Sequence, residues 1–150
     1  MNSEFLLQGL LNGGMLAAVA FLLSRFTKDI AGRAVLAFWL FGAAAMYVLF
    51  AVRGGEGAAA VLGELAGVAV YGTVALRGLR GSPLWLAAGW ALHPVWDIAL
   101  HYFGPGASFA PVEYTVSCLT FDLMVAAYIA VGYGTGLVGR RRSAEPVTAG

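Results

Sequence analysis

Charged side chains are scarce in this sequence. Asp, Glu, Lys and Arg make up 11% of its 150 residues, whereas about 25% is usual for a soluble domain. Apolar residues account for 60% of the chain, and the mean hydropathy is +0.79. A soluble domain needs a polar surface, so this composition excludes a soluble globular protein and predicts a polytopic, all-helical membrane protein.

Cysteine and lysine occur once each, and each count excludes one kind of chemistry. Cys118 is the single cysteine, which excludes an intrachain disulfide. The single lysine, Lys28, falls between two apolar segments, so a retinal Schiff base has no candidate. Three arginines at positions 140–142 follow the last apolar segment and indicate an anchor attracted to anionic lipid. We therefore expect membrane lipid as a partner and no nucleic acid.

The apolar residues fall into five segments separated by short polar or glycine-rich joints. Each segment is near the ~20 residues that a membrane-spanning helix requires, and we predict spans at residues 5–26, 34–52, 58–76, 83–103 and 113–138. The first lacks a preceding Lys or Arg and is expected to be a retained helix. The predicted organisation is a five-span domain over residues 1–139 and a polar, basic cytoplasmic tail over 140–150, without a soluble domain.

Lys and Arg predict the orientation, because these residues collect on the cytoplasmic side of a membrane. Eight of the nine cations flank the first joint, the third joint or the end of the chain, and only Arg53 lies on the opposite side. An odd number of spans then places the N-terminus outside and the C-terminus inside. We expect a bacterial plasma membrane and leave a homodimer open.

Ionisable residues recur at one level of these spans. With about 1.5 Å of rise per residue, His101, Asp97 and His93 lie ~3, ~9 and ~15 Å below the outer surface. Glu64 and Asp122, on two other spans, lie ~9 and ~13 Å deep on the same scale. Residues four apart share a helix face, so the three residues on the fourth span form one stripe. We expect an outward-facing polar pocket, lined also by Trp90, Trp96, Cys118, Asn12 and Gln8.

A divalent metal is one use of this pocket, since imidazole and carboxylate are common ligands for zinc, iron or manganese. The candidate ligands are His93, Asp97, His101 and Asp122, with zinc as the first choice. His93 and His101 are ~12 Å apart along the axis, so one ion would use Asp97 with one histidine and donors from other helices. The spare histidine would support that ion or bind a second.

Acid–base chemistry is the alternative that needs no metal. Buried carboxylates and imidazoles can exchange protons near neutral pH, which favours an intramembrane enzyme acting on a lipid-like molecule. His93, Asp97, Asp122 and Glu64 would then be the catalytic groups. A small proton- or ion-coupled transporter or sensor could use the same residues, and a structural membrane subunit could use them as contacts between helices.

Residues 90–128 carry a resemblance to known families. The stretch ALHPVWDIALHY, followed after a Pro-containing loop by SCLTFDLMVAAY, resembles an uncharacterised family of small bacterial integral-membrane proteins. The likeness depends on His93, Trp96, Asp97, His101, Cys118 and Asp122. It implies that these residues form one site and names no reaction.

Two other families share part of the pattern. Sterol isomerases of the emopamil-binding protein family are similar in having a histidine followed four residues later by an acid, and another acid on a later helix, here His93, Asp97 and Asp122. The second acid is aspartate where that family has glutamate. Ceramidase-like membrane hydrolases are similar in using histidine and aspartate as metal ligands, but their HxxxH pair is missing from this sequence.

Overall fold

A computed structural model describes residues 3–139 of the chain, and these residues form helices joined by short turns, without a strand. The helices are α1 (Ser3–Phe26), α2 (Asp29–Arg53), α3 (Ala58–Arg80), α4 (Leu84–Asp97) and α5 (Val112–Gly134). A π-helix, η1 (Ile98–Tyr102), continues α4, and a 3-10 turn, η2 (Pro105–Ser108), lies before α5. The predicted tail at 140–150 lies outside the described residues.

Four of these helices, α1, α2, α3 and α5, are long and apolar enough to cross a membrane. Large apolar side chains such as Leu11, Phe38, Leu62 and Val131 are exposed along them, as a lipid-facing surface requires. The chain is therefore a multi-pass membrane protein. The fourth predicted span, residues 83–103, is divided at Asp97, where α4 gives way to η1.

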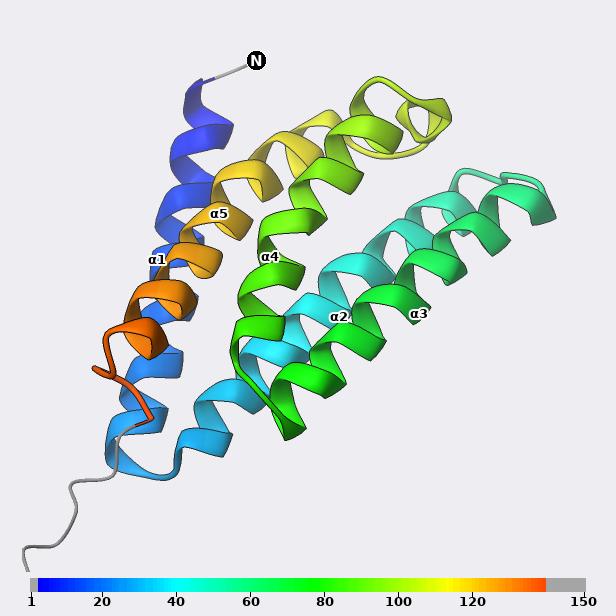
Figure 1. Cartoon of the computed structure of the whole chain (residues 1–150). Helices are drawn as coiled ribbons and strands as arrows, with labels where there is room; N and C mark the ends of the chain where they lie inside the picture. Colours follow the sequence, from blue (N-terminus) through cyan, green and yellow to red (C-terminus); the bar gives the residue numbers. More distant parts are fainter. Residues whose placement is uncertain (1–2, 140–150) are drawn as a thin grey trace, which may run out of the picture.

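The helices pack with α4 in the middle. α1 lies along α5, α2 lies along α3, and α4 fills the space between the two pairs (Figure 1). Small residues allow the closest approach: a β-carbon added to Gly9 would collide with the carbonyl oxygen of Ser117, and one on Gly13 would lie 2.6 Å from that of Phe121. Close backbone contact of this kind is a usual driving force for helix association in lipid.

Pro94 sits inside α4 and has no N–H with which to reach the carbonyl of Trp90. Despite this missing N–H, the helix keeps its α geometry as far as Asp97 and widens only over Ile98–Tyr102. The Phe103 N–H donates to the Ile98 carbonyl at 3.1 Å, five residues back. Single π turns inside α-helices often occur at functional sites, and this one carries His101.

Candidate metal centre

Three side chains from two helices meet at the centre of the bundle. His93 and Asp97 lie one turn apart on α4, and Asp122 comes from α5. His93 Nδ1 is 2.9 Å from Oδ2 of Asp122 and 3.3 Å from Oδ2 of Asp97. One donor atom from each residue lies within 4.8 Å of the others. We refer to these three residues as the His–Asp cluster.

The His–Asp cluster is sealed from solvent, since His93, Asp97 and Asp122 are all 0% exposed. Both carboxylate oxygens of Asp97, Oδ1 of Asp122 and Nε2 of His93 have no hydrogen-bond partner among the described residues. Buried carboxylate oxygens without donors are costly in a low-dielectric interior. The neighbouring side chains therefore leave these oxygen and nitrogen atoms without partners, and a bound cation could interact with them.

A second acid–imidazole pair lies next to the cluster. His101 on η1 is 0% exposed, and its Nε2 is 3.0 Å from Oε1 of the buried Glu64 on α3. The Tyr47 ring of α2 stacks on His101 with centroids 3.6 Å apart and an interplanar angle of 12°, and its centroid lies 6.3 Å from that of His93. Tyr47 thus connects the two groups through van der Waals contact.

The charges of the two groups do not balance. Three carboxylates, from Glu64, Asp97 and Asp122, face two imidazoles, and no described Lys or Arg forms an ion pair with any of them. Even with both imidazoles protonated, one negative charge would remain. Because an uncompensated charge at this depth is unfavourable by several kcal/mol, the site needs a further proton or a metal ion.

The loop between α4 and α5 closes the site at one end. Gly106 in η2 is buried, and a β-carbon there would collide with the His101 ring and lie 2.9 Å from the Leu100 carbonyl oxygen. The Phe109 ring meets His101 edge to face, with centroids 6.1 Å apart. The prediction of an outward-open pocket is therefore wrong. The polar side chains pack on one another, and the η2 loop covers them.

Aromatic residues hold the α4 side of the site in place. The Tyr71 ring meets His93 edge to face at 4.8 Å, and its hydroxyl donates to the Leu92 carbonyl at 3.2 Å. Trp96 packs against Tyr71 and against Gly67, where an added β-carbon would lie 3.0 Å from the indole. Trp90 is fully buried and packs against a neighbouring α5 ring. These contacts restrict the rotamer of His93.

Of three other residues expected to line a pocket, two lie away from the cluster and one lies beside it. Gln8 and Asn12 are exposed on α1, so this helix brings no polar side chain to the described cluster, and the prediction that they line it is wrong. Asn12 instead lines a separate cavity with Trp39 and Phe121, because depth does not fix direction. Cys118 is buried one turn before Asp122, and its sulfur is outside the set of three donor atoms.

Sequence reasoning missed Tyr47, which is 1% exposed and has a hydroxyl without a hydrogen-bond partner in the described chain. A signal for it exists: Tyr47 carries the single hydroxyl of the second predicted span, residues 34–52. His101, expected as a metal ligand, also lies outside the three-donor set. The wider turn of the π-helix after Asp97 changes the direction of the His101 side chain, which pairs with Glu64.

The spacing of the donors fits a small divalent ion. Bonds of about 2.0–2.1 Å at tetrahedral angles place ligand atoms roughly 3.3 Å apart. The two separations from His93 Nδ1, 2.9 and 3.3 Å, are close to this value. One imidazole and two carboxylates suit zinc, manganese or iron. The buried His–Asp cluster could therefore hold a metal ion.

The fold and the cluster define a class: a multi-pass membrane protein with a buried His/Asp group able to hold a metal ion. A family model described as a family of unknown function (DUF6010) matches residues 8–135. The chain belongs to this family, and the match includes both the cluster and the second pair. Neither the curated proteins nor the solved structures yielded a match.

Proposed function

We propose that this protein is a metal-binding integral membrane protein whose metal centre is the His–Asp cluster. One observation carries the proposal: two fully buried carboxylates converge on one imidazole, and three of their four oxygens lack hydrogen-bond donors among the described residues. Contacts between helices alone would favour neutral, mutually satisfied groups. Zinc is the first choice of metal, and manganese or iron fits the same donors.

His93, Asp97 and Asp122 would be the protein ligands. When bound, a divalent metal with three protein ligands supplies Lewis acidity and a free coordination position. Tyr71 and Trp96 orient the imidazole, and the closed packing excludes water. The wider function that we propose is an intramembrane metal-dependent enzyme, with a lipid-like substrate because apolar side chains surround the site.

The proposal includes a membrane topology. α4 and η1 together run over residues 84–102 and would form a fifth crossing beside the four long helices. The N-terminus would lie outside, because the cations near the α1–α2 and α3–α4 turns belong on the cytoplasmic side. Under this arrangement Glu64, His101 and the η2 loop lie toward the outer surface, and the protein resides in the plasma membrane.

Metal analysis tests the proposal directly. We expect the purified wild-type protein to hold stoichiometric metal after incubation with zinc and desalting, and Asp97→Asn and Asp122→Asn to lose it. Glu113→Gln, which removes an exposed carboxylate at the start of α5, is the control and should retain it. His101→Gln should also retain it. Metal absent from the wild type, or kept by both aspartate variants, would overturn the proposal.

Proton or ion transport is the second candidate, and Tyr47 is the observation that favours it. Its ring lies against both His101 and His93, so titratable groups continue from the His–Asp cluster to Glu64. In proteoliposomes, a transporter should show a pH-dependent flux that His101→Gln abolishes without loss of metal. No flux through the wild type would exclude this candidate.

A further inference from the structure

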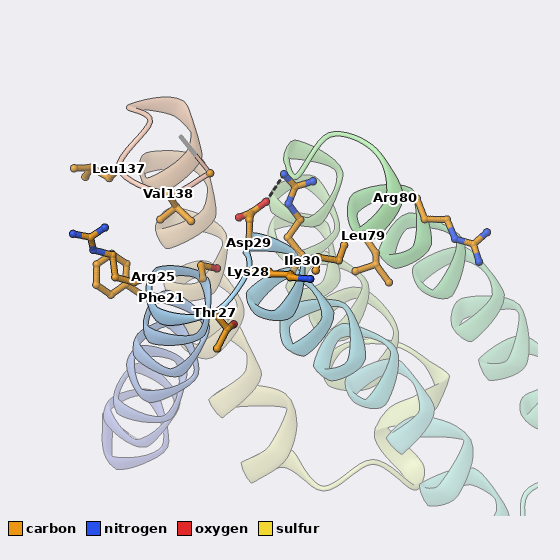
Figure 2. Close-up of a pocket in the computed structure, with 13 residues that line it drawn as sticks. Phe21, Arg25, Thr27, Lys28, Asp29, Ile30, Leu79, Arg80, Leu137 and Val138 are labelled. Atoms are coloured by element: carbon orange, nitrogen blue, oxygen red, sulfur yellow. Dashed lines mark ion pairs between the residues drawn. The ribbon is translucent and has the colours of Figure 1, made fainter. Parts of the chain in front are cut away.

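A second feature, a basic cavity, lies at the end of the bundle opposite the η2 loop. It has a volume of about 760 Å³ and lies where α1 ends, α2 begins and α3 ends. Four cations, Arg25, Lys28, Arg33 and Arg80, line it together with one carboxylate, Asp29. Figure 2 shows Arg25 and Arg80 on opposite sides of Asp29, whose carboxylate forms an ion pair with Arg33.

The Arg33 side chain lines this cavity and is held in place by several contacts. Its guanidinium pairs with Asp29 at 2.6 Å, donates to the Gly81 carbonyl at 2.8 Å and lies 5.3 Å from the centroid of the Tyr133 ring. The Tyr133 hydroxyl donates to the same Asp29 carboxylate at 2.7 Å. The one carboxylate of the cavity is thus already neutralised, and it cannot neutralise the remaining cations.

Arg25, Lys28 and Arg80 are exposed and form no ion pair with a described residue. The N-terminus of α2 opens here without a side-chain cap, and helix N-termini attract anions. Exposed cations and an uncapped helix N-terminus therefore line one cavity.

Apolar side chains identify the source of the anion. Phe21, Ile30 and Leu79 line the same cavity and would contact the glycerol and acyl groups of a lipid. A free phosphate ion has no apolar part that could contact these side chains. We propose that this cavity binds the phosphodiester headgroup of an anionic membrane lipid. Basic pockets between spanning helices are suited to such headgroups, and arginine forks match phosphate oxygens.

The experiment compares three probes on the full-length protein in a neutral detergent. Phosphatidylglycerol, phosphatidylcholine and inorganic phosphate are titrated separately, and bound lipid is counted by native mass spectrometry. We expect saturable binding of phosphatidylglycerol that exceeds that of phosphatidylcholine by at least tenfold. Equal binding of the two lipids, or displacement of phosphatidylglycerol by equimolar inorganic phosphate, would overturn the proposal.

Charge-removing variants locate the site. Arg25→Gln and Arg80→Gln should each weaken phosphatidylglycerol binding about fivefold, the change that corresponds to about 1 kcal/mol per cation near an anionic lipid. Arg77→Gln is the matched control, because Arg77 lies on the same end of α3 but contacts Trp85 and not the cavity. An equal loss in Arg77→Gln would indicate diffuse attraction and contradict the proposal. Arg25→Lys, which keeps the charge, should retain most of the binding and guards against misfolding.

Discussion

Replacement of His93 by leucine tests whether the His–Asp cluster carries charge or only joins helices. Leucine fills most of the imidazole volume but leaves the carboxylates of Asp97 and Asp122 facing each other, both 0% exposed. Loss of one partner from a buried charged group costs about 3–5 kcal/mol. A neutral contact between membrane helices is worth only about 0.6 kcal/mol on average, with a maximum near 1.7. The two interpretations therefore predict separable losses.

The assay is reversible unfolding in mixed micelles, followed by circular dichroism, with a chelator present so that the difference belongs to the side chains. We expect His93→Leu to lower the free energy of unfolding by about 3–5 kcal/mol. Adding Asp97→Asn and Asp122→Asn to this variant should restore more than half of the loss, because it removes the uncompensated charges. A loss below about 2 kcal/mol without such restoration would show that the cluster carries no net charge and would favour a structural role.

Two other substitutions test the surroundings of the site. Gly106→Ala should lower the free energy of unfolding by about 1–3 kcal/mol, because its β-carbon would collide with the His101 ring. Gly63→Ala, whose β-carbon would meet nothing within 4 Å, should be neutral or stabilising in the same unfolding assay. Tyr47→Phe should change stability by less than about 0.5 kcal/mol, since its hydroxyl has no described partner, whereas Tyr47→Ala should cost about 3–5 kcal/mol by opening a cavity beside His101. Equal effects of the two glycine variants, or of the two tyrosine variants, would contradict the packing described for η2 and α2.

Composition and charge were enough to predict the membrane class and the approach of distant residues. Scarcity of charge and long apolar runs require lipid-facing helices, and the structure has four of them. Depth counting placed Asp122 within reach of His93, although they are 29 residues apart, and the structure puts them 2.9 Å apart. The depth of a residue can be predicted from the sequence because an α-helix rises by a fixed distance per residue.

Direction and closure could not be predicted in the same way. Gln8 and Asn12 lie on a helix that is apolar on all sides, so no amphipathic pattern indicates which face is buried. Pro94 signals a weak point in α4, but tertiary packing determines that the π turn begins at Ile98. The fit of Gly106 against His101 depends on loop geometry, which a span pattern does not contain.

X-ray absorption at the K edge of the bound metal is the most direct test of the proposed metal centre. We predict nitrogen and oxygen neighbours at about 2.0–2.2 Å in the wild-type protein, with loss of the signal in Asp122→Asn. A sulfur neighbour near 2.3 Å would assign the ion to Cys118 and rule out the His–Asp cluster as its site. A wild-type protein that binds no metal would contradict the proposed metal centre as well.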